Sequence, residues 1–237
     1  MHDLVKHLDP AVLERVIVAC EKARGTGVVV FDLDSTLLDN RPRQAQILRE
    51  FGAAAKLAVL SSVEPKHWTS WDIRDAMRAA GMSAADVEAH AEAAKTFWRE
   101  RFFTSSYAAI DDAVHGAQAY VARLVTTGVH IAYVTGRHED MRHGSVVAFQ
   151  RLGFPVPGPG VQLLMKPTFE QSDDAWKEEA YARLRQIGHV VAAFDNEPTH
   201  INGYEKAFPD AICVHLATDH SGRPVTLGST IRSVDRF

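Results

Sequence analysis

The chain has 237 residues and a formal net charge of -4, and 46% of its residues are apolar while 24% are charged. These fractions are typical of soluble globular domains and disfavour disorder, collagen-like structure and low-complexity repeats. The length fits either one large α/β domain or a core with a smaller insert. Because binding to nucleic acid or anionic membranes rests on concentrated Lys and Arg, the mild negative charge favours neither partner.

Three features bear on location. The longest unbroken apolar runs cover 16–20 and 190–194, far short of the roughly 20 residues that span a bilayer. The N-terminal stretch MHDLVKHLDP lacks the apolar region of a secretory signal. Cys20 and Cys213 each lie in an apolar run and have no metal-binding spacing. We therefore expect buried thiols and a cytoplasmic protein.

The N-terminal half of the chain predicts one strand among helices. A helix over 10–23 is followed by the β-branched and aromatic run 28–31, which is typical of a strand buried on both faces. From 41 to 103 the apolar spacing is helical throughout, and Ser83 with Asp86 forms a weak capping box at the start of one of these helices. No strand is predicted within this segment.

The C-terminal half alternates strands with helices. Strands are predicted over 129–134, 161–165, 190–194 and 211–216, and helices over about 117–127, 139–152, 176–187 and from 198. The tail 217–237 is turn-rich, and we predict no element there. This alternation indicates a parallel sheet with right-handed crossovers.

The block between the first two strands is much longer than a crossover requires. We therefore predict a helical insert that forms its own domain. The expected organisation is an α/β core over 1–38 and 112–237, with a helical cap over 39–111.

Polar side chains follow the first four strands at their carboxyl ends. These strands end in FDLDST, YVTGR, MKP and FDNEP, in chain order. In open parallel α/β sheets, ligands bind beyond the carboxyl ends of the strands. We therefore expect the four segments to meet at one edge of the sheet and form a site.

Two aspartates of FDLDST create an electrostatic problem. Asp32 and Asp34 lie two residues apart in extended chain, which places both side chains on one face about 6.5 Å apart. At an effective dielectric near 20, such carboxylates repel by roughly 2–3 kcal/mol, so a cation must offset the repulsion or one acid must be protonated. Asp195 on a neighbouring strand adds a third acid, and a site of carboxylates and water suits Mg²⁺.

The same groups suit phosphoryl transfer. One aspartate can attack phosphorus to form an acyl-phosphate while the other moves a proton. Thr135 and the backbone N–H groups of Gly136 and Arg137, which we place at a helix start, can donate hydrogen bonds to a phosphate. Lys166, directly after the third strand, can neutralise charge on the phosphate oxygens.

In this order, the four segments resemble the motifs of the haloacid dehalogenase superfamily of phosphohydrolases. FDLDST resembles the first motif, an apolar strand that ends DxDx[T/V], and YVTGR, MKP and FDNEP resemble the second, third and fourth. The resemblance covers about 28–216. It implies a Rossmann-like parallel sheet of strand order 3-2-1-4-5 flanked by helices, and a C1-type cap that closes over the substrate.

The resemblance also implies residue roles. Asp32 becomes the nucleophile and Asp34 the general acid and then base. Both, with Asp195, become ligands of Mg²⁺, Asp34 through its backbone carbonyl. Thr135, Gly136 and Lys166 become the phosphate-binding residues, and Thr36 helps to fix the catalytic loop.

The fourth motif departs from the family pattern, which often carries a second acid. Asn196 and Glu197 follow Asp195 here. We assign Asp195 to the metal and leave Asn196 and Glu197 as groups that act through water.

The predicted function is a Mg²⁺-dependent phosphatase that hydrolyses a small phosphomonoester through an aspartyl-phosphate. The alternatives are a phosphotransferase, a phosphonate hydrolase, which needs a lysine such as Lys56, Lys66 or Lys95 in the insert, and a non-catalytic module that binds a ligand or protein. The intact set of motif residues argues against the last alternative.

Two further sets of residues have competing interpretations. Arg137 fits a substrate contact and a structural ion pair equally well. The aromatic side chains of the insert fit either an apolar substrate pocket or helix packing, of which packing is favoured; they are Trp68, Trp71, Trp98, Phe102 and Phe103.

Overall fold

A computed structural model describes residues 8–237 and divides them into two compact units. One unit contains the chain up to Leu38, together with Ala113–Glu139 and Phe149–Phe237. The other contains Asp39–Asp112 and Asp140–Ala148. The first seven residues, which belong to the stretch tested for a secretory signal and to the predicted core, lie outside the described part.

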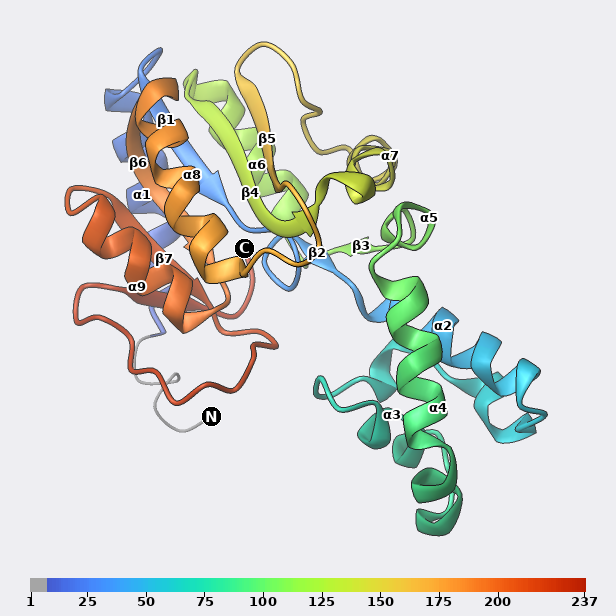
Figure 1. Cartoon of the computed structure of the whole chain (residues 1–237). Coiled ribbons are helices and arrows are strands. Elements are labelled where there is room, and N and C mark those ends of the chain that lie inside the picture. Colours follow the sequence, from blue (N-terminus) through green and yellow to red (C-terminus); the bar gives the residue numbers. More distant parts are fainter. Residues whose placement is uncertain (1–7) are drawn as a thin grey trace. The chain divides into compact units, whose positions relative to one another are not determined.

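The first unit is built on a six-stranded parallel sheet (Figure 1). Its order is β5 (Val161–Lys166), β4 (His130–His138), β1 (Gly27–Phe31), β6 (His189–Asp195), β7 (Ile212–Leu216) and β8 (Arg232–Val234). The first five reproduce the predicted order 3-2-1-4-5, with β1 inside the sheet. The α/β fold class is confirmed, and β8 is an addition from the tail, where no element was predicted.

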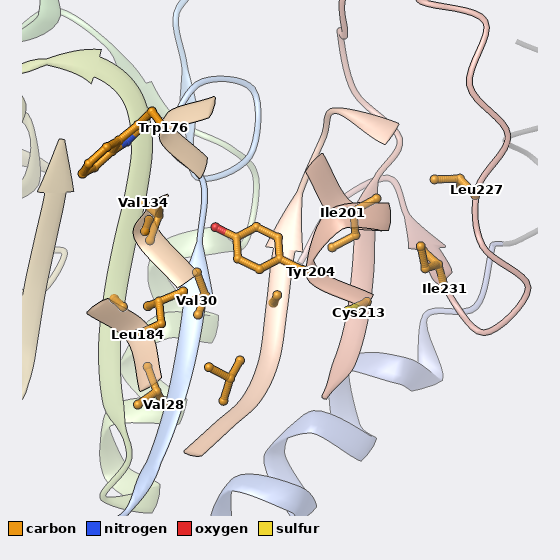
Figure 2. Close-up of a cluster of buried hydrophobic side chains, with 14 residues drawn as sticks. Val28, Val30, Val134, Trp176, Leu184, Ile201, Tyr204, Cys213, Leu227 and Ile231 are labelled. Atoms are coloured by element: carbon orange, nitrogen blue, oxygen red, sulfur yellow. The ribbon is translucent and has the colours of Figure 1, made fainter. Parts of the chain in front are cut away.

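Both faces of the sheet are covered, which explains why β1 is wholly apolar. Val28 and Val30 pack with Trp176 and Leu184 of α8 (Asp173–Ile187) and with residues of α9 (Pro198–Ala207), as Figure 2 shows. Every residue of β1 is buried. A strand that alternates between two buried faces has no position for a polar side chain.

An aromatic cluster lies among the remaining core residues. Phe31 stacks on Phe194 with ring centroids 4.7 Å apart, and Tyr120 of α6 (Ala117–Thr127) packs edge-on against Phe194. The Tyr120 hydroxyl donates to the Leu13 carbonyl of α1 (Ala11–Lys22) at 3.0 Å. The C-terminal Phe237 ring lies 5.3 Å from that of Tyr120, so the end of the tail joins this cluster.

The register aligns the strand ends that carry the motifs. Phe31 of β1 pairs with Tyr133 of β4 on one side and with Phe194 of β6 on the other. Because the strands are parallel, the residues after these three positions emerge at the same edge. This alignment brings the first, second and fourth motifs together.

The second unit is helical within its described residues. It contains α2 (Arg41–Ala54), the 3₁₀ segments η2 (Ala58–Ser62) and η3 (Pro65–His67), α3 (Ile73–Ala79), α4 (Ala84–Phe102) and α5 (Ser105–Ala108). The Ser83 side chain caps α4 by accepting from the Asp86 N–H at 3.1 Å, as the sequence predicts. Two short strands, β2 (Leu38–Asp39) and β3 (Asp112–Ala113), pair with each other.

Cys20 and Cys213 are free thiols and both are buried, as expected. Burial raises the pKa of each to about 12, so neither is a reactive thiolate. In the part of the chain that the structure describes, no helix combines the length and the apolar character needed to cross a membrane.

The second unit contains a buried ion pair. The Arg43 guanidinium lies 2.9 Å from the Asp111 carboxylate, and both side chains are fully buried. Arg43 also donates to the Phe102 carbonyl at 2.8 Å and lies 3.8 Å over the Phe102 ring. The pair therefore joins α2, the first helix of the unit, to the end of the segment Asp39–Asp112.

Replacing Arg43 should destabilise the protein strongly. Arg43→Met removes the guanidinium that lies 2.9 Å from a fully buried carboxylate, and breaking a buried ion pair costs about 3–5 kcal/mol. Arg78→Met is the matched control because Arg78 pairs with Asp75 at the same 2.9 Å with half of both side chains exposed, and it should cost less than about 1 kcal/mol. Urea unfolding followed by circular dichroism measures both. Equal losses would contradict the assigned role of the Arg43 pair.

Candidate active site

The loop after β1 is shaped by local hydrogen bonds. The backbone N–H of Asp32 still donates to the Phe194 carbonyl at 2.9 Å, which continues the pairing with β6. The chain then turns, and the Leu33 carbonyl accepts from the N–H groups of Thr36 and Leu37 at 3.1 and 2.9 Å. Ser35 has a φ of 60°, a left-handed conformation that costs free energy in a non-glycine residue. This tight turn presents Asp32 and Asp34 from a fixed backbone.

Lys177 of α8 links the first and fourth motifs. Its ammonium donates to Asp32 Oδ1 at 2.7 Å, to Asp195 Oδ2 at 2.9 Å and to the Val134 carbonyl at 2.8 Å. All three ammonium protons thus have acceptors, and the lysine side chain is 2% exposed. The cation that the paired aspartates require is therefore a residue of the protein itself.

Sequence reasoning missed Lys177. The signal is its position, because Lys177, Ala180 and Leu184 recur at helical spacing and all three are buried. A lysine on the apolar stripe of a helix demands buried carboxylate partners. Asp32 and Asp195 are those partners.

Burial and Lys177 have opposite effects on the pKa values of the Asp32 and Asp195 carboxyl groups. Burial raises the pKa of Asp32 to about 7, although the adjacent ammonium works against this rise. Burial also acts upward on Asp195, but Lys177 and His200 outweigh it and hold the pKa of Asp195 below its usual range. Burial disfavours the charged form of Lys177, and the two carboxylates nevertheless raise its pKa well above that of a free lysine. Lys177 and Asp195 therefore stay charged at neutral pH.

Arg137 holds Asp34. Its Nε donates to Asp34 Oδ2 at 2.7 Å and its terminal nitrogen donates to Oδ1 at 2.9 Å, a bidentate pair. The guanidinium is 2% exposed while the carboxylate is 26% exposed, so Asp34 keeps a face toward solvent. Of the two interpretations of Arg137, the ion pair is the one that the structure contains.

The second motif has a different backbone from the one expected. We placed Gly136 and Arg137 at a helix start, which is wrong: β4 continues to His138, and α7 (Arg142–Leu152) begins only after the short 3₁₀ segment η4 (Glu139–Met141). Two residues bulge out of the ladder between Thr135 and His138, which pair with successive residues of β5.

Side chains define the shape of this bulge. The Thr135 hydroxyl accepts from the Arg137 N–H at 3.2 Å, and a Cβ on Gly136 would lie 2.8 Å from the Asp173 carboxyl carbon. The Thr135 carbonyl accepts from the Trp176 indole N–H at 2.9 Å, which anchors α8 beside the motif. The Thr135 hydroxyl and the Trp176 indole therefore hold the bulge, and the Asp173 carboxylate packs against Gly136.

The carboxylate that Lys166 contacts is Asp173, and not one of the paired aspartates. Its ammonium bonds to the Asp173 carboxylate at 2.8 Å, and that carboxylate is 53% exposed. The lysine that contacts Asp32 is thus Lys177, while a phosphate-binding role for Lys166 stays a prediction.

The tail secures the fourth motif. The Thr36 hydroxyl donates to Asn196 Oδ1 at 3.2 Å, which joins the first motif loop to the fourth. The Asn196 amide donates to the Asp219 carbonyl at 2.6 Å. Glu197 accepts from the Ser221 N–H and hydroxyl at 3.0 and 2.9 Å. Asn196 and Glu197 therefore hold the 219–221 segment beside the motifs.

His200 extends the buried charge network, and sequence reasoning missed it too. Its Nδ1 lies 3.7 Å from Asp195, and its Nε2 lies 2.9 Å from Asp174, which also pairs with Arg223. Burial alone would lower the pKa of His200, but Asp195 raises it. His200 thus links the fourth motif to α8 and the tail.

The donor set fits a magnesium ion held by few protein ligands. Asp32 and Asp195 converge on one ammonium, so their carboxylates are close neighbours. Over residues 8–237, no group of three or more His, Cys, Asp or Glu side chains is arranged as a metal cage. Mg²⁺ commonly uses one or two carboxylates together with substrate phosphate and water, which agrees with two carboxylates here.

Removing each lysine should separate their roles. Lys177→Met leaves two buried carboxylates without their shared cation, so we expect a loss of about 3–5 kcal/mol in the free energy of unfolding. Lys166→Met, the matched control, breaks a pair with a half-exposed partner and should cost less than about 1 kcal/mol. Urea unfolding in magnesium-free buffer measures both. A Lys177 variant as stable as the control would refute the assigned bridge.

The fold is shared with solved structures at low sequence identity. Protein tyrosine kinase A of Mycobacterium tuberculosis is 19% identical with a TM-score of 0.53, over 88% of this chain and 93% of that one. A dehalogenase is 16% identical with a TM-score of 0.50, over 89% and 93%. A haloacid dehalogenase-like hydrolase of Streptococcus pneumoniae is 7% identical with a TM-score of 0.49, over 87% and 92%. No protein-family model and no curated protein matches the sequence. The chain therefore shares its α/β fold with protein tyrosine kinase A and with the dehalogenase.

Proposed function

We propose that the protein is a magnesium-dependent phosphatase that hydrolyses a small phosphomonoester through an aspartyl-phosphate on Asp32. The observation that carries the proposal is the buried bridge from Asp32 through Lys177 to Asp195. Asp34, two residues from Asp32, is bound by the Arg137 guanidinium. A buried carboxylate with a raised pKa beside a second, partly exposed carboxylate is an arrangement common at catalytic sites.

In the first step, an Asp32 oxygen attacks phosphorus and the bond from phosphorus to the leaving oxygen breaks. Asp34, in its protonated form, gives its proton to the departing alkoxide, so the alcohol leaves neutral. Arg137 fixes the direction of the Asp34 carboxyl group through two hydrogen bonds. Orientation of this kind lowers the entropic part of the barrier.

In the second step, Asp34 takes a proton from a water molecule, and the water oxygen attacks phosphorus. The bond between phosphorus and Asp32 breaks, which releases inorganic phosphate and regenerates the carboxylate. Lys177 stabilises that carboxylate as it reappears because its ammonium lies 2.7 Å from Asp32 Oδ1.

The remaining motif residues take supporting roles in the proposal. Thr135, Gly136 and Lys166 bind the phosphoryl oxygens, and Asp32, Asp195 and the Asp34 backbone carbonyl hold the metal. When bound, Mg²⁺ supplies positive charge that screens the carboxylates from the phosphate dianion. The helical second unit acts as the cap, and the protein works in the cytoplasm.

A phosphotransferase is the nearest alternative because it would use the same first step and replace water by another acceptor. One structural neighbour is a protein tyrosine kinase, but a similarity at 19% identity extends to the fold alone. We therefore propose water as the acceptor of the phosphoryl group. Product analysis distinguishes the hydrolase from the transferase. If phosphate release falls short of alcohol release in the presence of added alcohols, the enzyme is a transferase.

Asp32→Asn should abolish turnover of p-nitrophenyl phosphate in the presence of magnesium. An amide is a poor nucleophile, so we expect kcat to fall at least about 10³-fold, with the fold unchanged by circular dichroism. Asp235→Asn, at an exposed aspartate of the tail, is the control and should keep wild-type activity. An Asp32→Asn variant with wild-type turnover would refute the mechanism.

Removal of magnesium should also abolish activity. Dialysis against EDTA is expected to remove turnover of p-nitrophenyl phosphate, and added Mg²⁺ should restore it. Because binding to the native state stabilises it, Mg²⁺ should also raise the melting temperature of wild type more than that of Asp195→Asn. Full activity in EDTA, or equal thermal shifts in the two proteins, would contradict the assigned metal ligands.

A further inference from the structure

A cavity of about 320 Å³ lies among residues of the second unit alone. Its polar and aromatic lining consists of Trp68, Trp71, Trp98, Asp72, Arg74 and Lys95. Small-molecule sites in proteins commonly start at about 300 Å³ and combine apolar walls with a few polar groups. Nothing in the proposed phosphatase chemistry uses this cavity.

The Phe102 ring packs against two of the tryptophans that line the cavity. Trp98 stacks on Phe102 with ring centroids 4.4 Å apart, and Trp71 packs edge-on against the same ring at 6.0 Å. Trp68 is 2% exposed, whereas Trp71 is 40% exposed. Helix packing, the interpretation favoured from the sequence, describes Trp68 but not Trp71. A large indole surface left open on a cavity is suited to stacking with a planar ring.

Two indole N–H groups of the lining residues are unsatisfied. The Nε1 atoms of Trp68 and Trp98 are buried and have no acceptor among the residues that the structure describes. More than about 90% of buried polar groups in native proteins are paired, and an unpaired donor costs about 1–3 kcal/mol. Both nitrogen atoms are closed off from solvent, so this cost belongs to the packing behind the cavity wall and not to the open space of the cavity.

The charges of the lining favour an anion. Two cations face one carboxylate, and Lys95 of α4 takes part in no ion pair or hydrogen bond within the described chain. Arg74 is partly neutralised, because it lies 2.8 Å from Glu92 and 3.8 Å from Asp72. Asp72 in turn caps α3 by accepting from the Arg74 N–H. Lys95 is therefore the cation available to a ligand.

We propose that this cavity binds a planar aromatic ligand that carries an anionic group. The ring stacks on the exposed Trp71 indole, and the anion pairs with Lys95. The site belongs to the second unit by itself, so binding does not require Asp32 or magnesium.

Isothermal titration calorimetry on the full chain tests the proposal with 4-hydroxyquinoline-2-carboxylate. This probe has a planar ring, oxygen acceptors and a carboxylate, and it contains no phosphate to hydrolyse. The uncharged 4-hydroxyquinoline should bind at least about tenfold more weakly, and so should cyclohexanecarboxylate, which has the charge without the planar ring.

Variants locate the site. Lys95→Gln and Trp71→Ala should each weaken binding of the probe about tenfold or more, and both change exposed side chains, so the fold should survive. Lys66→Gln, at an exposed lysine elsewhere in the unit, is the matched control and should bind as wild type. Asp32→Asn should also bind the probe normally, which separates this result from any failure of the phosphatase proposal.

Three outcomes of the probe and variant titrations overturn the proposal. They are no detectable binding at millimolar probe, equal binding of the charged and uncharged rings, and an affinity that Lys95→Gln and Trp71→Ala leave unchanged. Loss of probe binding in Asp32→Asn would also overturn it, because the ligand would then lie at the motif residues of the first unit.

Discussion

The chemistry-bearing part of the structure depends on one buried ammonium. Lys177 lies between Asp32 and Asp195, and its third proton bonds to the Val134 carbonyl, so it has contacts with β4 and with the residues that end β1 and β6. Without it, two carboxylates from neighbouring strands would be buried side by side without their shared cation, at a cost of about 3–5 kcal/mol. The ammonium makes the convergence of the motifs energetically possible.

Helix packing, and not a loop, fixes the position of Lys177. Trp176, the preceding residue of α8, is fully buried and its indole bonds to the Thr135 carbonyl, while Leu184 packs on β1 from the same helix. Because an α-helix is stiff over these turns, the apolar contacts fix the depth at which Lys177 enters. The buried face of α8 thus both packs on the sheet and positions the Lys177 ammonium.

Much of the first unit was predictable because the periodicity of apolar residues indicates its strands, while the strand order followed from the family resemblance of the motifs. The aspartate pair and Asp195 were also predictable, since parallel strands bring their ends to one edge. Lys177 was not, because its partners are 145 and 18 residues away in sequence and its own neighbours suggest an ordinary amphipathic helix. The bulge at Gly136 and the strand Arg232–Val234 depend on tertiary contacts with Asp173 and with β7, which local patterns do not encode.

The bridge also changes what a metal contributes. The sequence places three carboxylates at one sheet edge, and their repulsion calls for a cation. In the structure, two buried cations lie beside these carboxylates: Lys177 pairs with Asp32 and Asp195, and Arg137 pairs with Asp34. With all three carboxylates ionised, these five groups carry one net negative charge, which is a modest attraction for a divalent ion. In the proposed function, a phosphate dianion would add two more negative charges beside the same carboxylates. We therefore expect magnesium and phosphate to bind cooperatively if the protein is the proposed phosphatase.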